Sequence, residues 1–203
     1  MASITRCCRS WPSLLGRLAL LLALALAAAV PGIAHAGNIE PVQADLKPGE
    51  DGHVLSAEFA VDLGPRLEEA VARGVPLYFN LEFVLERNRW YWLNEQVASI
   101  TINYRLAYNA LTRQYRLSVG GLHQSFATLA EAMRVIARVS ALPVADKGAL
   151  KPGENYTAAL RLSLDRSQLP KPLQVDAIAN SDWQVSTKAL RWQFSPPPES
   201  PAK

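Results

Sequence analysis

Cysteine is almost absent from this sequence. Its two cysteines, Cys7 and Cys8, are adjacent and lie near the start of the chain, and residues 37–203 contain none. That long segment can therefore form no disulfide, and it offers no thiol nucleophile and no thiolate ligand for a metal. A domain of this length buries about 70% of its unfolded-chain surface, so a hydrophobic core can stabilise it without cross-links.

A concentrated excess of charge is also lacking. The formal net charge is +3, from 21 Lys and Arg against 18 Asp and Glu. Arg6, Arg9 and Arg17 all fall in the first 36 residues, which contain no acidic side chain, so residues 37–203 are formally neutral. Domains that bind nucleic acid usually carry clustered basic charge. The sequence therefore predicts that nucleic acid is not a partner.

Residues 1–36 have the pattern of a secretory signal. Basic residues up to Arg17 precede an apolar run of 13 residues, Leu18–Val30, and Ala34-His35-Ala36 supplies small side chains just before Gly37. The run is shorter than the roughly 20 residues that span a membrane. We therefore expect cleavage between Ala36 and Gly37, a mature protein with no transmembrane segment, and a periplasmic location. The alternative is that the segment stays as an uncleaved anchor.

Alternation of apolar and polar side chains dominates the rest of the chain and predicts half-buried antiparallel strands. It is strongest in 53–63, 77–86, 100–108 and 156–164, and weaker in 39–46, 114–119, 122–126, 142–146 and 189–194. Together these strands predict one domain over residues 37–194, a two-layer antiparallel β-sandwich of immunoglobulin-like architecture with about eight strands. The Pro-rich segment 195–203 is predicted to be a disordered tail.

Two short helices are expected between the strands. The first, 65–73, starts at Pro65 and ends before Gly74. The second, 128–139, starts with a capping box in which Thr128 and Glu131 bond each other's backbone amides. In Leu169–Gln174, two prolines spaced two residues apart favour polyproline II. We interpret that segment as a connection that crosses the sheet, with a docking arm as the alternative.

No local pattern of catalytic or metal-binding residues is present. His53 and His123 are the only histidines after residue 36, and neither has a second ligand at the spacing of a metal motif. The sequence thus predicts no catalytic residue, no metal ligand and no cofactor, and it identifies no small-molecule ligand. An enzyme would need a histidine that the fold brings next to a serine or a carboxylate.

The most distinctive cluster is the run Arg87–Asn94, which reads Arg-Asn-Arg-Trp-Tyr-Trp-Leu-Asn. Trp, Tyr and Arg are the residues that most often anchor protein interfaces. We therefore select Arg89, Trp90, Tyr91 and Trp92 as the candidate partner-binding residues. The alternative is that both tryptophans lie in the core, which is the interpretation we favour for Trp183 and Trp192.

Four strings in this sequence carry a resemblance to a known family: Arg89-Trp-Tyr-Trp-Leu93, Tyr108–Leu117, Gly121–Phe126 and Leu169–Gln174. With them the chain resembles, over about 39–194, the exported proteobacterial proteins grouped as DUF4390, a domain of unknown function. The resemblance implies a Gram-negative source and a periplasmic or envelope location. It also implies a gene neighbourhood that often includes a membrane sensor kinase of the nitrogen-regulation type, and it transfers no catalytic residue.

These observations favour a non-enzymatic accessory module that binds a protein of the envelope or membrane. One alternative is an envelope hydrolase with a non-local active site. Another is an outer-membrane β-barrel, which the capped helix 128–139, the prolines at 143 and 170–172 and the trailing polar tail argue against.

Overall fold

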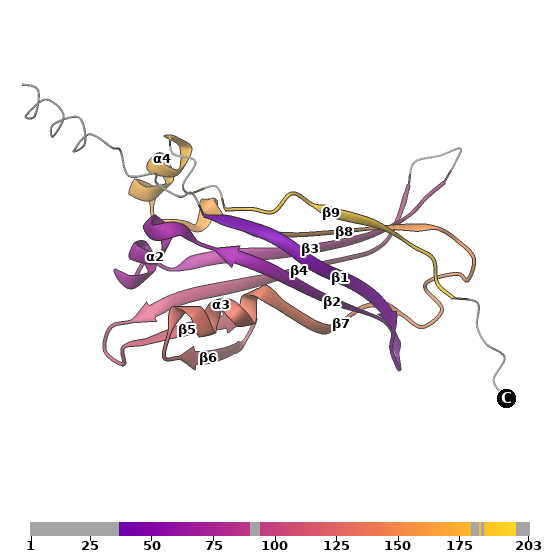
Figure 1. The fold of residues 1–203 in the computed structure, drawn as a ribbon, viewed down its shortest axis with the longest axis horizontal. Helices are drawn as coiled ribbons and strands as arrows, with labels where there is room; N and C mark the ends of the chain where they lie inside the picture. Colours follow the sequence, from indigo (N-terminus) through magenta and orange to yellow (C-terminus); the bar gives the residue numbers. More distant parts are fainter. Residues whose placement is uncertain (1–36, 90–93, 180–182, 184, 198–203) are drawn as a thin grey trace, which may run out of the picture. The chain divides into compact units, whose positions relative to one another are not determined.

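The computed structural model describes residues 37–89, 94–179, 183 and 185–197, which form a mainly β structure (Figure 1). Three antiparallel strands form the smaller sheet, in the order β1 (Asn38–Pro48), β2 (Gly52–Asp62) and β7 (Arg138–Asp146). Six antiparallel strands form the larger sheet, in the order β6 (Leu122–Phe126), β5 (Gln114–Val119), β4 (Glu95–Asn109), β3 (Leu77–Arg87), β8 (Tyr156–Leu164) and β9 (Leu190–Phe194). The predicted β-sandwich is confirmed, with nine strands in the described part of the chain where about eight were expected.

The core lies between the two sheets and follows the predicted alternation. On β3 the inward side chains are almost completely buried, and on β8 the alternate side chains from Tyr156 to Leu164 are buried against them. The smaller sheet contributes Leu55, Ala57 and Phe59 from β2 to the same cluster. Each large apolar side chain buried here contributes about 1.5–3 kcal/mol, whereas an exposed ion pair contributes about 0–1 kcal/mol. Apolar burial, rather than surface charge, therefore holds the sheets together.

Helices α2 (Gly64–Ala72) and α3 (Leu129–Ala137) occupy the predicted positions. The capping box of α3 is confirmed: the Thr128 hydroxyl accepts from the Glu131 amide at 3.3 Å, and the Glu131 carboxylate accepts from the Thr128 amide at 3.3 Å. The helix is shorter than the predicted 128–139, because the chain enters β7 directly at Arg138. Val139 is buried as a strand residue, and both the helical and the strand periodicity place it toward the core.

The polyproline II conformation predicted for Leu169–Gln174 is wrong from Lys171 onward, whereas Leu169, with φ −69° and ψ 151°, has it. A short 3₁₀ helix, η1 (Arg166–Gln168), is followed by a third helix, α4 (Lys171–Ala179). Pro172 lies in the first turn, where a backbone amide has no acceptor inside the helix, so its missing N–H costs little. The Pro170 carbonyl accepts from the amides of Leu173 and Gln174 at 2.9 and 3.1 Å, which starts the helix.

The first residues after β9 are packed. The Ser195 hydroxyl donates to the Asn155 side-chain oxygen at 2.6 Å, and Pro196 is buried. Ser195 and Pro196 are therefore packed, although composition predicts that they belong to a disordered tail. A proline ring is apolar and can pack on another apolar surface. Residues 198–203 and the predicted signal, 1–36, lie outside the described residues. No helix within the described ranges combines the length and the hydropathy that crossing a membrane requires.

Candidate functional site

The run selected from the sequence lies where β3 ends and β4 begins. Arg87 is the last residue of β3, and it pairs in register with Glu95 on β4 and with Tyr156 on β8. We call Arg87, Asn88, Arg89 and Glu95, with Glu154 and Asn155 from the loop before β8, the hairpin end. The end of β3 and the start of β4, which are close in sequence, therefore meet the distant loop before β8 at this end of the six-stranded sheet (Figure 1).

The guanidinium group of Arg87 joins two of these segments. Its Nε donates to the Glu95 carboxylate at 3.0 Å, and its Nη2 donates to the same carboxylate oxygen. Its Nη1 donates to the Glu154 carboxylate at 2.9 Å. Arg89 donates to the same Glu95 oxygen, so the charges form a chain, Arg89–Glu95–Arg87–Glu154. The Arg87 side chain is only 18% exposed, so solvent screens the centre of this chain less than its ends.

These hydrogen bonds also fix the protonation states at the hairpin end. The bond from Arg87 is the main reason that the pKa values of Glu95 and Glu154 lie below their ordinary range. The same bonds to Glu95 and Glu154 raise the pKa of Arg87. All three groups therefore stay charged at neutral pH. The hairpin end is a fixed array of charges, which suits the binding of a polar or charged group.

A polar hollow of about 640 Å³ opens beside this array. Its walls are held by hydrogen bonds: the Asn88 amide donates to the Asn155 carbonyl at 3.2 Å, and Thr157 donates to the Asn88 side-chain oxygen at 2.9 Å. Tyr156 donates to Glu154 at 3.3 Å and accepts from the Lys151 amide at 2.8 Å. The hollow is lined by Arg87, Asn88, Arg89, Lys151, Glu154, Asn155 and Gln193.

Of the four residues selected from the sequence, the structure describes Arg89 alone. Arg89 is partly exposed, lines the hollow and pairs with Glu95. Trp90, Tyr91 and Trp92 lie outside the described residues, so their burial stays a prediction. Trp183 is buried, as predicted, and Trp192 packs partly buried on the core, its ring centre 6.4 Å from that of Phe83.

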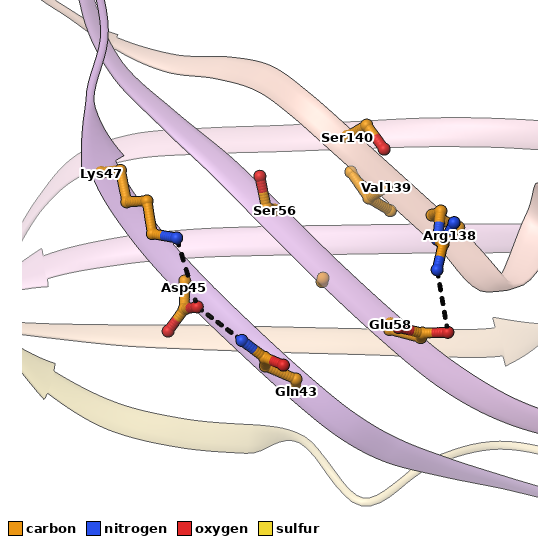
Figure 2. A pocket seen from close by; sticks show the side chains of 9 residues that line it. Gln43, Asp45, Lys47, Ser56, Glu58, Arg138, Val139 and Ser140 are labelled. Atoms are coloured by element: carbon orange, nitrogen blue, oxygen red, sulfur yellow. Dashed lines mark hydrogen bonds and ion pairs between the residues drawn. The ribbon is translucent and has the colours of Figure 1, made fainter.

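A second hollow, of about 180 Å³, lies on the outer face of the smaller sheet (Figure 2). In Figure 2, Gln43 and Lys47 both reach Asp45 on β1, and Arg138 on β7 reaches Glu58 on β2. The charged groups match in number and pair with one another at 3.7 and 3.4 Å. Exposed pairs of this kind contribute little binding energy. The side chains in these pairs are 41–67% exposed, whereas the Arg87 side chain at the hairpin end is 18% exposed, so we do not select this hollow as the functional site.

The two histidines lie in different surroundings. His123 is exposed on the edge strand β6. His53, on β2, faces a hollow of about 410 Å³, and its ring centre lies 5.6 Å from that of Phe194. Among the described residues, no hydrogen bond joins either imidazole to a serine or a carboxylate, and no group of three or more His, Cys, Asp or Glu side chains could hold a metal ion. The described residues thus offer no positive support for the hydrolase alternative.

Sequence reasoning missed Glu95 and Glu154, the acceptors that hold the hairpin end together. Glu95 follows Arg87 by eight residues, across the turn between two strands, and that spacing was the one local signal. Glu154 lies 67 residues from Arg87 in a loop, and no local pattern connects the two. Only the pairing of β3 with β8 brings them together.

Comparison with known proteins identifies the family. No curated protein and no solved structure matches the sequence. Residues 36–193, nearly the whole described region, match the family described as a domain of unknown function, DUF4390, in agreement with the resemblance seen in the sequence. This chain belongs to the DUF4390 family.

Proposed function

We propose that this chain is an exported accessory module that binds a protein partner of the cell envelope through the hairpin end. The observation that carries the proposal is the Arg89–Glu95–Arg87–Glu154 chain of charges. An arginine side chain has many rotamers, and ordering them on binding costs about 0.5–1.5 kcal/mol. Glu95 already holds Arg89, so part of that cost is met within the protein before a partner arrives.

The chemistry at the hairpin end matches what protein interfaces use. Arginine, tryptophan and tyrosine are the commonest anchors of interfaces, and Arg89 is followed directly by Trp90, Tyr91 and Trp92. The signal-like segment 1–36 supports export. The partner would therefore be an envelope or membrane protein, and the family's gene neighbourhood suggests the outer part of a membrane sensor kinase as the specific candidate.

The test is affinity capture of the tagged protein, expressed from its full-length chain, out of crosslinked cell envelopes. Arg89→Ala and the double change Trp90→Ala with Trp92→Ala should each abolish recovery of the partner that the unaltered protein captures. Arg116→Ala, at an exposed position on β5, should leave recovery unchanged. Thermal unfolding of all variants should stay close to that of the parent protein.

Two results would count against the proposal. Recovery of the same partner by the Arg89→Ala and tryptophan variants would place the interface elsewhere. A large loss of thermal stability in the tryptophan variant would assign Trp90 and Trp92 to the core.

A further inference from the structure

A groove of about 680 Å³, which we call the helix groove, lies between α2 and α3, on a different part of the molecule from the hairpin end. Its lining includes the apolar side chains of Leu63, Leu129 and Met133, together with Tyr115 of β5. Leu63 and Met133 are 3% and 8% exposed, so the groove reaches down to the core. Helix α2 precedes the first residue of β3, and the hairpin end follows its last, so the two surfaces lie roughly 33 Å apart along that strand.

The charged side chains that line the groove are all acidic. They are Asp62, Glu68 and Glu69, and no lysine, arginine or histidine lines it among the described residues. Asp62 is held in place because its carboxylate accepts from the Gly64 amide at 2.9 Å. Glu69 pairs with the exposed Arg73 at 2.6 Å, outside the lining. At the hairpin end, by contrast, two arginines and two glutamates balance each other.

An apolar floor with a rim of one charge fits a complementary amphipathic segment. We propose that the helix groove binds a short basic amphipathic segment of a partner protein, with its apolar side chains against Leu129 and Met133 and its Lys or Arg side chains beside Glu68 and Glu69. Grooves of this kind bind helical segments through anchors spaced three and four residues apart. An acidic rim repels anionic lipid headgroups and nucleic-acid phosphates, so a basic polypeptide is the fitting occupant.

The test uses the protein expressed from its full-length chain and a fluorescent helical peptide with leucines on one face and lysines on the other. Anisotropy should report binding that weakens as salt is added. A matched peptide with glutamate in place of lysine, and another with serine in place of leucine, should not bind. Both matched peptides keep the length of the probe, so they separate the contribution of charge from that of apolar contact.

Variants then locate the binding. Glu68→Gln and Glu69→Gln should each weaken binding about two- to fivefold at low salt, as expected for exposed ion pairs. The control Glu50→Gln, an exposed acid in the β1–β2 turn, should have no effect. Ala130→Trp would fill the groove from an exposed helix position and should weaken binding on the order of tenfold. Val135→Trp, exposed on the same helix but outside the groove, is its control.

Four results would overturn the inference. Two concern the peptides: the lysine peptide does not bind, or the glutamate peptide binds equally well. The third is that Val135→Trp weakens binding as much as Ala130→Trp does. The fourth is that the protein forms a concentration-dependent dimer, which Ala130→Trp abolishes. The last would make a second copy of this chain the occupant. The hairpin-end variants do not alter the groove, so this inference and the proposed function fail separately.

Discussion

Arg87 shows how one side chain can organise a surface. Its guanidinium group has donors pointing in fixed directions, and it reaches Glu95 on one side and Glu154 on the other. A lysine has the same charge but only one nitrogen, so it lacks the planar fork that can bond both carboxylates in this geometry. Position 87 therefore requires arginine for its contacts with both carboxylates, although lysine would give the same net charge.

His53 is the second residue whose surroundings determine its chemistry. Its Nδ1 is buried and has no hydrogen-bond partner among the described residues, and Phe194 packs edge-on to the ring. Glu50 and Lys147 line the same hollow and carry opposite charges. Burial lowers the pKa of His53 from its ordinary value of 6.5, so the folded state favours the neutral imidazole.

We predict that His53 makes the free energy of unfolding fall as the pH drops below about 6.5. The unfolded chain takes up a proton on this imidazole at a higher pH than the folded chain does, so protons favour unfolding in that range. Urea unfolding between about pH 5 and 8 should show this slope in the parent protein and a smaller slope in His53→Gln. His123→Gln, at an exposed position, should keep the parent slope. Equal slopes for the parent and His53→Gln would contradict the prediction.

At the scale of elements, β7 is the least regular strand. Ser140 and Ala141 together lie opposite Ser56, which forms a bulge, and the register shifts again near Pro143. The Ala141 amide donates to the Ser56 hydroxyl at 3.4 Å. β7 is an edge of the smaller sheet, and bulges and prolines on edge strands hinder pairing with another chain.

Ala141 has a backbone φ of 50°, in the left-handed region. That conformation costs an L-residue about 1–2 kcal/mol and costs glycine almost nothing. We predict that Ala141→Gly raises the free energy of unfolding by up to about 1 kcal/mol, because the relief of strain exceeds the added entropy of the unfolded chain. Ala60→Gly, at an exposed position on β2, should instead lower it by about 0.5–1 kcal/mol. Urea unfolding of both variants measures the difference, and a loss of stability in Ala141→Gly would show that no strain is stored there.

Elements with a strong local pattern could be predicted from the sequence, and β8 has the predicted bounds, Tyr156–Leu164. Prediction failed where a local rule had an exception. Pro172 reads as a helix breaker, yet it is tolerated in the first turn of α4. Val139 fits a helical stripe, yet it belongs to β7, because pairing with β2 outweighs the weak helical preference of a β-branched residue.

At the scale of the whole molecule, the two candidate surfaces differ in how far the sequence could reveal them. Arg89 and the aromatic residues after it are consecutive and stand out in the sequence. The helix groove combines Glu68, Leu129 and Tyr115 from separate elements. Its residues form no local motif, so only the arrangement of the fold brings them to one surface.

We predict that the protein is exported and that its exported form starts at Gly37. The structure also requires glycine at this first residue. An added Cβ at Gly37 would lie 2.2 Å from the Leu63 carbonyl oxygen, so no side chain fits there without movement of the backbone. Intact-mass measurement should show the loss of residues 1–36. Ala36→Arg should block cleavage, because signal processing requires a small residue there. A recovered protein that retains its first 36 residues would identify the segment as an anchor.

The position of β3 within the larger sheet has a consequence for the time order of folding. β3 lies between β4, which follows it directly, and β8, which begins at Tyr156. β3 cannot pair with a strand along both of its edges until the chain up to Leu164 is available. Contacts between segments so distant in the sequence form slowly. A chain with this contact order therefore completes little native structure until its second half is available. This topology allows the whole chain to be released before the larger sheet is complete, which is the order of events that the export proposed above requires.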